Sequence, residues 1–269
     1  MIAADATNLP PGAYYGSVQI HAPPDSPVAI TVPVTFNVTL KQPVSLQPGS
    51  PLVASIVNAA SQTVGAIAPG EMVSLLGLEL GPQSPASYQL DAAGNVATSL
   101  AGLTQVNTVV PYEVAGKTSV EIAVEINGMR FTTGAPVAAS APAVFTADAT
   151  GHGQASAYNS DTSTNSAANP AARGSAISLF ATGAGQTVPD GITGQISQGQ
   201  PSQPVLGVSV KIGSTAAVVQ SVAPVPGQVA GLFKLIAIVP PAVAPGPSVP
   251  VVLTVGSSSG PSGVTIAVQ

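Results

Sequence analysis

Two stretches of the sequence, 129 residues apart, carry the same fifteen-residue pattern with identical residues at its two ends, and this internal repeat limits the possible folds most. The first is AGLTQVNTVVPYEVA, which begins at Ala101, and the second is AGLFKLIAIVPPAVA, which begins at Ala230. In each, Ala-Gly-Leu leads into a segment expected to be a strand, 105–110 and 234–239, and Val-Pro ends it. A repeat of this kind predicts a duplicated structural unit.

The flanking segments repeat as well. NAASQTVGAIAPGEMVSLLGLELGP starts at Asn58 and NSAANPAARGSAISLFATGAGQT starts at Asn165, and each contains an apolar segment that predicts a strand. The repeated unit has roughly 100–120 residues, the size of one sandwich domain, and patterns of helical period are scarce. The sequence therefore predicts an all-β chain with two tandem Ig-like β-sandwich domains, at 52–147 and 148–269.

A third feature is the alternation of apolar and polar residues over 28–40, VAITVPVTFNVTL. Period-two alternation of this length predicts a strand with one apolar face. That face comprises Val28, Ile30, Val32, Val34, Phe36, Val38 and Leu40. With a preceding strand near 14–20 and the turn PPDSP, residues 1–42 form an expected β-hairpin, followed by a linker at 43–51. Because a lone hairpin is marginal in water, we expect these strands to complete a sheet of their own chain or of another copy.

Charge and cysteine content exclude several classes of function. Charged residues make up 6% of the chain, the net charge is −5, and six residues are Lys or Arg. Too few cations exist for a basic patch, so nucleic acid is not expected as a partner. The absence of Cys excludes disulfides and thiol chemistry, and no apolar run is long enough to span a membrane. The opening MIAADATNLPPG lacks the regions of a signal peptide, so a secreted protein would contain this chain as a mature form or a fragment.

Five segments in a fixed order resemble the Solibacter-type C-terminal domain, a module at the ends of large exported proteins of Acidobacteria. They are IVNAASQTVGAIAPGEMVSLLGLELGP, TQVNTVVPYEVAG, APAVFTADATGHGQASAYNSDTSTNSAANPAARGSAISLFATGAGQT, GVSVKIGSTAAVVQSVAPVPGQVAGLFKLIAIVP and GVTIAVQ. The resemblance covers about 52–269. The segment LPPGAYYGSVQIHAP and the strand after it resemble the last strands of the bacterial Ig-like domains that often precede this module. The resemblance implies export and a β-sandwich build, at the cell surface or outside the cell, and it implies no activity.

No residue pattern predicts catalysis. The sequence GSSSG at 256–260 fits G-x-S-x-G but lies between two expected strands, where a hairpin loop is the better interpretation. Glu121 and Glu125 share one strand face about 13 Å apart, which exceeds the spacing of glycosidase carboxylates. The two histidines, His21 and His152, show no metal spacing, although Asp148 and Asp161 near His152 leave a calcium loop conceivable.

A hydrolase would instead require Glu71, Glu113 or Asp190 to meet His152 or a serine in a pocket. We expect neither an enzyme nor a bound cofactor.

Two functions remain from the sequence alone. The first is a structural module that associates with itself, in a filament for example, through the apolar strand 28–40. The second is a polysaccharide-binding or adhesion module of a larger secreted protein. It would use exposed aromatic residues, for which the adjacent Tyr14 and Tyr15 are the candidates because one of them must face outward.

Overall fold

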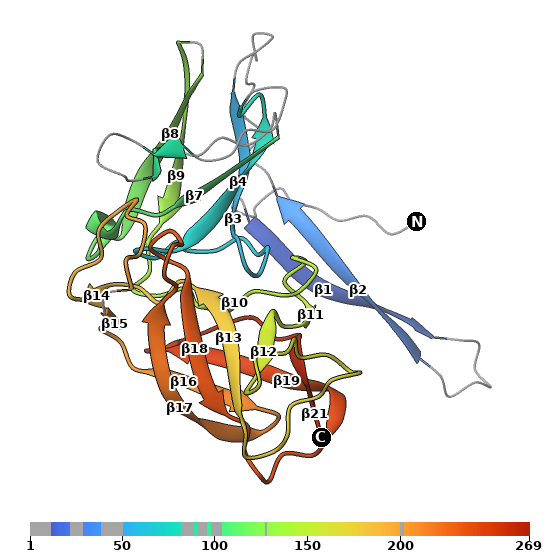
Figure 1. The fold of residues 1–269 in the computed structure, drawn as a ribbon. Coiled ribbons are helices and arrows are strands. Elements are labelled where there is room, and N and C mark those ends of the chain that lie inside the picture. The colour runs from blue at the N-terminus through green and yellow to red at the C-terminus, as the bar shows by residue number, and fades with distance from the viewer. Residues whose placement is uncertain are drawn as a thin grey trace. The chain divides into compact units, whose positions relative to one another are not determined.

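The alternating segments of the sequence form strands throughout the computed structural model of the chain (Figure 1). The structure describes residues 51–81, 104–126, 128–199 and 202–269 in full, and the backbone of 12–21, 29–38, 89–90 and 96–97. Within these ranges the one helical element is a 3₁₀ turn, η1 (Tyr112–Val114). The all-β prediction is therefore confirmed. The chain divides into two units, Met1–Pro48 and Gly49–Gln269, which are described separately.

The first unit contains the predicted hairpin, formed by β1 (Gly12–His21) and β2 (Ala29–Val38). The strands are antiparallel, and the register pairs Tyr14 with Phe36 and Val18 with Val32. Since alternate residues of a strand lie on the same face, these pairs share a face with the pairs Gly16–Val34 and Ile20–Ile30. The predicted apolar face thus agrees with the register at 30, 32, 34, 36 and 38. Val28 and Leu40 lie outside the described residues.

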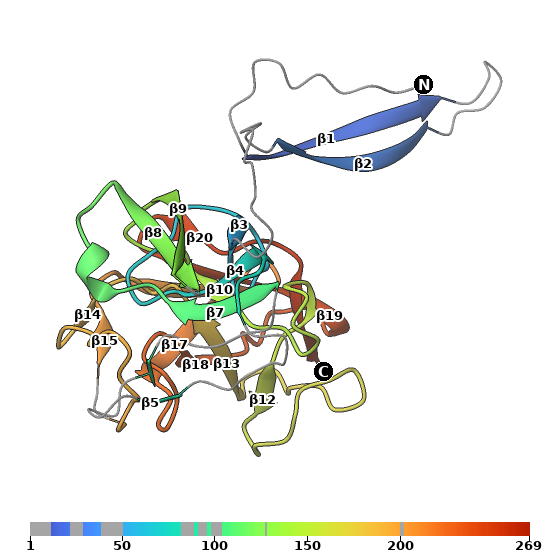
Figure 2. The same ribbon diagram turned by 90° about the horizontal axis from the view of Figure 1, so that it is seen from above.

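The second unit has two parts, which we call the small lobe (residues 51–137) and the large lobe (residues 138–269). The strands of the small lobe are β3 (Leu52–Asn58), β4 (Met72–Leu78), β5 (Gln89–Leu90), β6 (Val96–Ala97), β7 (Gln105–Val109), β8 (Ser119–Ile126) and β9 (Met129–Pro136). They make one sheet in the order β3-β4-β7 and two strand pairs, β5-β6 and β8-β9. Figure 2 shows the β8-β9 pair beside β7, β4 and β3.

The core of the small lobe lies between its three-stranded sheet and the β8-β9 pair. Val73 and Leu75 of β4 are almost fully buried, and Ile122 of β8 packs against both of their clusters. The side chains that β8 contributes to this core are half-buried, and they alternate with exposed side chains along the strand. The core of this lobe is therefore thin, and its side chains cover only one face of β8.

The large lobe is built on one sheet whose main path is β10-β13-β18-β17-β16-β19-β21-β11, with β12 paired to β13 and β20 to β19. Its strands are β10 (Ala143–Val144), β11 (Gly153–Gln154), β12 (Ala157–Asn159), β13 (Ala176–Thr182), β16 (Val208–Ile212), β17 (Thr215–Pro224), β18 (Phe233–Ile238), β19 (Gly246–Val255), β20 (Ser258–Ser259) and β21 (Val264–Val268). A separate pair joins β14 (Thr187–Val188) to β15 (Gln203–Pro204). One apolar core, with Ile177, Leu179 and Ile212 fully buried, holds the strands together.

The internal repeat reappears as repeated hydrogen bonds. In the small lobe the Gly70 N–H donates to the Val110 carbonyl (2.9 Å), and in the large lobe Gly174 donates to Val239 (2.8 Å). The return bonds match as well, because Val110 donates to Glu71 (2.8 Å) and Val239 to Ser175 (2.9 Å). The duplicated sequence thus gives the same local structure in lobes whose sheets differ in size. The division into two Ig-like sandwiches stays a prediction.

The two lobes contact each other through polar groups with little exposure. The Met72 N–H donates to Thr182 Oγ1 (2.8 Å), and Thr182 has no exposed surface. The Asn58 side-chain amide donates to the Ala141 carbonyl (3.0 Å). These bonds fix the position of the small lobe on the large lobe, which matters because a cavity lies between them.

Candidate functional site

The carboxylates considered for catalysis are dispersed. Glu121 and Glu125 are exposed on β8, as the strand alternation predicts, and Glu121 lies 3.5 Å from Arg130 in an ion pair. Glu113 accepts a hydrogen bond from Thr193 Oγ1 (2.6 Å), which is the main reason that the pKa of Glu113 is lowered. A carboxylate that is ion-paired or bonded in this way is engaged with its neighbour rather than with a reacting group.

Glu71 is the exception, because it is buried to 1% exposure and lies with three serines around a cavity of about 150 Å³. Burial raises the pKa of Glu71 to about 8, against hydrogen bonds from the Ala68 N–H (2.7 Å) and the Asn58 side chain. A carboxyl that keeps its proton below this pH is a poor general base at neutral pH.

The serines around Glu71 bond elsewhere. Ser61 pairs with Thr63 (2.7 Å), and Ser259 pairs with Thr254 (2.9 Å). His152 is exposed and lies against Gly263, away from this cavity's lining. The arrangement lacks the hydrogen bond between nucleophile and base on which nucleophilic hydrolysis depends.

The GSSSG segment forms a hairpin loop, as predicted. β19 pairs with β20 through Val255–Ser258 and Thr254–Ser259, and Gly256 turns the chain with a φ of +59°. No helix follows, so the strand-turn-helix setting of a serine nucleophile is missing here.

The loop around His152 uses its carboxylates to cap turns. Asp148 accepts from the N–H (3.1 Å) and the hydroxyl (2.9 Å) of Thr150, and Asp161 accepts from the N–H of Ser163 (3.0 Å) and from its hydroxyl. These bonds lower the pKa of both aspartates. Among the described residues no group of three His, Asp or Glu side chains lies close enough to hold a metal ion.

A long groove of about 1310 Å³ runs along the edges of β7 and β8 in the small lobe. Every residue of β8 lines it, as do Val106, Thr108 and Val109 of β7, whereas no residue of β9 does. Within the described residues β7 pairs with β4 alone and β8 with β9 alone, so two strand edges flank the groove. Its floor is apolar, with Val73 and Leu75 of β4. We call this feature the strand groove.

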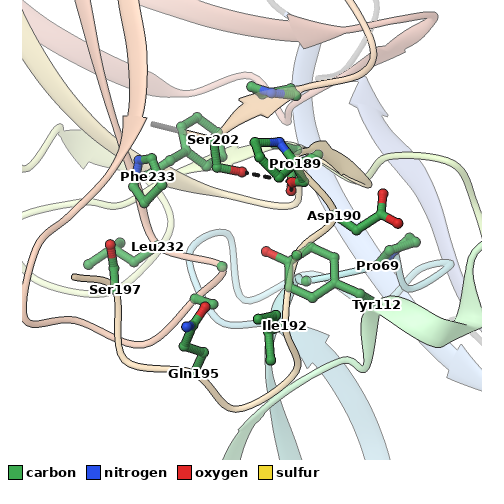
Figure 3. Close-up of a pocket in the computed structure, with 18 of the residues that line it drawn as sticks. Pro69, Tyr112, Pro189, Asp190, Ile192, Gln195, Ser197, Ser202, Leu232 and Phe233 are labelled. Atoms are coloured by element: carbon green, nitrogen blue, oxygen red, sulfur yellow. Dashed lines mark hydrogen bonds between the residues drawn. The ribbon is translucent and has the colours of Figure 1, made fainter. Parts of the chain in front are cut away.

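A second cavity, of about 430 Å³, lies between the lobes and is lined by residues of 184–198 and 202–204, the ends of β17 and β18, and Tyr112. Tyr112 is the first residue of η1, the turn after β7, and Pro111 is the N-cap residue of that turn. Its N–H donates to Thr193 Oγ1 (2.9 Å), so the large lobe holds the backbone of this turn. The Tyr112 ring reaches into the cavity, with its hydroxyl toward the centre (Figure 3). We call this feature the Tyr112 cavity.

Tyr112 has 6% of its surface exposed, and burial raises the pKa of its hydroxyl. Gly70 and Gly191 both lie against the ring, because a Cβ on either residue would overlap its carbon atoms. Gly70 also has a φ of +68°, which side chains rarely adopt. Two glycines from different lobes therefore make room for one buried tyrosine.

The residues singled out from the sequence lie elsewhere. Ile30, Val32, Val34, Phe36 and Val38 are in β2. Tyr14 and Tyr15 are consecutive in β1, opposite Phe36 and Thr35, and therefore belong to opposite faces of the hairpin. Their roles in subunit contact and in ligand binding stay predictions.

Sequence reasoning missed both the strand groove and the Tyr112 cavity. A signal for the tyrosine exists, because Tyr112 occupies the repeat position that Pro241 has in the second copy. The two turns differ at Tyr112 and Glu113, which correspond to Pro241 and Ala242, so the turn itself requires neither side chain. No comparable signal exists for the strand groove, because free strand edges depend on pairing across the whole lobe.

None of the described residues forms a helix that could cross a membrane. Comparison of the chain with protein-family models, with curated proteins and with solved structures gives no match in any of the three.

Proposed function

We propose that the chain is a structural, non-enzymatic β module of an exported protein, and that it assembles by inserting the hairpin of one copy into the strand groove of the next. The observation that carries this proposal is the pair of strand edges on either side of an apolar groove. The proposal of export rests on the resemblance to C-terminal domains of exported proteins, and the low charge of the chain favours self-association.

The strand groove has the properties of an acceptor for a strand. Within the part of the chain that the structure describes, β7 and β8 each have one edge without a paired strand, and such an edge presents backbone N–H and C=O groups that an added strand can pair with. The volume of about 1310 Å³ exceeds the range of roughly 300–1,000 Å³ that is typical of small-molecule sites. The half-buried Ile122 and Val124 of β8 gain burial only if something covers the groove.

The hairpin has the matching properties of a donor. Its strands have ten residues each, and β8 has eight, so the lengths suit each other. The register assembles an apolar face from both strands, including the pairs Val18–Val32 and Ile20–Ile30. Each copy in such a polymer has one donor surface and one acceptor surface. A head-to-tail contact of this kind gives an open filament, unless the rotation between neighbouring copies closes a ring.

The connection between the donor and the acceptor is long enough for an exchange between copies. β2 ends at Val38 and β3 begins at Leu52. The intervening residues span up to about 45 Å when extended. The same length also permits insertion into the groove of the same chain, and the experiment separates the two cases.

The test is the mass of the full chain in solution, by light scattering over a range of micromolar concentrations, with negative-stain microscopy. We expect particles of many 26.2 kDa units that lengthen with concentration. Val34→Glu places a charge on the apolar face of the hairpin and should reduce the mass to that of one chain. Thr35→Glu, one residue away on the other face, is the matched control and should assemble normally.

A wild-type chain that stays at 26.2 kDa would reject self-assembly and leave insertion within one chain. Assembly that Val34→Glu does not change would place the subunit contact elsewhere.

A further inference from the structure

We infer that the Tyr112 cavity binds a small neutral molecule with a mainly apolar body and one oxygen that hydrogen-bonds Tyr112. The inference goes beyond the proposed assembly and is independent of it, because it concerns a different part of the second unit. Among the described residues, the Tyr112 cavity and the strand groove share no lining residue.

The first argument is the state of the Tyr112 hydroxyl. The residue is 6% exposed, and no described residue forms a hydrogen bond with its hydroxyl, although its backbone N–H is paired. Buried polar groups in native proteins almost always have a partner. Since this hydroxyl faces the cavity, its partner comes from whatever occupies that space (Figure 3).

The second argument is that both lobes hold Tyr112 in one position. The ring lies against Gly70 of the small lobe and Gly191 of the large lobe, and neither position has space for a Cβ. Thr193 fixes the backbone of Tyr112 from the large lobe. The hydroxyl is therefore held in one place by both lobes, as a binding group must be to select a ligand by hydrogen bonding.

The third argument concerns the charge of the ligand. Among the described residues that line the cavity, Asp190 is the one charged residue, and none is a Lys, Arg or His. An anion would enter a site with no cation and one carboxylate, so anionic ligands are disfavoured. The lining is mostly apolar, including Ile192, Leu232 and Phe233, which favours an apolar body for the ligand.

The polar groups of the lining restrict the ligand further. Ser202 Oγ donates to the Pro189 carbonyl (3.3 Å), and Ser197 Oγ accepts from the Gly199 N–H (3.3 Å). Both hydroxyls therefore take part in bonds within 189–202, Ser202 as a donor and Ser197 as an acceptor. Tyr112 then supplies the fixed polar contact, and one polar atom on the ligand is enough to meet it.

The size and exposure of the site argue against a sugar ligand. The cavity volume of about 430 Å³ lies in the small-molecule range and holds about fourteen water volumes. A sugar that stacks on an aromatic platform needs an open ring face, whereas the Tyr112 side chain is buried. The geometry therefore points to a compact, weakly polar molecule rather than a polysaccharide.

The test uses 2-naphthol, a neutral apolar molecule with one hydroxyl, and naphthalene, which lacks that hydroxyl. The chain has no Trp, so naphthol fluorescence can be followed without protein background from indole. We expect saturable binding of one 2-naphthol per chain. Tyr112→Phe should weaken 2-naphthol binding about three- to tenfold, the effect of losing one hydrogen bond, and leave naphthalene binding unchanged.

Leu232→Trp fills the cavity and provides the second variant. Because this variant introduces an indole, its binding of the two probes is measured by equilibrium dialysis instead of fluorescence. The substitution should abolish binding of both probes, and urea denaturation of each variant confirms that it is folded. The inference is overturned if 2-naphthol does not saturate, if Leu232→Trp binds it as well as the wild type, or if Tyr112→Phe weakens both probes equally. Binding of glucose in preference to 2-naphthol would overturn the assigned ligand class.

Discussion

Replacing Glu71 by Gln should stabilise the protein at neutral pH and leave its stability unchanged in acid. Glu71 is 1% exposed in the small lobe, and burial raises its pKa from 4.5 to about 8. The folded chain therefore keeps the carboxyl proton over a range of pH in which the unfolded chain has released it. Ionisation favours unfolding, so stability is complete below pH 4.5 and is lost as the pH rises toward 8.

The magnitude follows from the two pKa values. Between them the free energy of unfolding falls by up to about 1.4 kcal/mol per pH unit. At pH 7.5 the accumulated loss is about 4 kcal/mol, because the unfolded carboxyl is fully ionised and the folded one largely protonated. Gln has the same shape, retains an oxygen to accept the Ala68 N–H, and does not ionise. The variant should therefore exceed the wild type by about 4 kcal/mol at pH 7.5.

The assay is urea denaturation of wild type and Glu71→Gln from pH 4 to pH 9. The control is Glu125→Gln, which changes an exposed carboxyl on β8 and should reproduce the pH dependence of the wild type. The reasoning is refuted if the difference between Glu71→Gln and wild type is the same at every pH. It is also refuted if the variant is the less stable protein at pH 7.5.

Two further substitutions probe the packing of the second unit. Gly191→Ala should destabilise the chain by about 1–3 kcal/mol, because its Cβ overlaps the Tyr112 ring, whereas Gly207→Ala has open space and should change little. Asn165→Ala should cost about 3 kcal/mol, because the buried amide bonds both the N–H and the carbonyl of Ala267 (2.9 Å each). Urea denaturation measures both effects, and neutral substitutions would contradict the packing described here.

Local strand structure could be predicted because side-chain period and turn residues encode it. Residues 28–40 alternate strictly, and β2 covers 29–38 of them with the expected register. The repeat that begins at Ala101 and Ala230 likewise leads to equivalent bonds at Gly70 and Gly174. These features depend on residues close in sequence, which a pattern can represent.

The cavity beside Glu71 and the Tyr112 cavity could not be predicted, because they depend on contacts between distant segments. The burial of Glu71 follows from packing among 56–71, 141–142 and 258–261, and nothing beside it in the sequence indicates that a carboxyl will lose its solvent. The Tyr112 cavity is lined by residues from 69–70, 184–198, 202–204 and 222–233 in addition to Tyr112. A tyrosine in a turn is usually expected at the surface, whereas the ring of this one lies against Gly70 of the small lobe and Gly191 of the large lobe.

The central claim is that the hairpin of one copy occupies the strand groove of another, and disulfide trapping between two chains tests it most directly. The chain contains no Cys, so introduced thiols have no native competitor. One chain carries Ile122→Cys in the groove, and its partner carries Cys at position 30, 32, 34 or 36 in turn. A thiol pair bonds only when the two Cα atoms lie within about 7 Å.

We predict a linked pair of two different chains for at least one of these positions, and none when the partner carries Thr35→Cys instead. Equal yields for both faces of the hairpin, or closure only within a chain that carries both substitutions, would contradict the account.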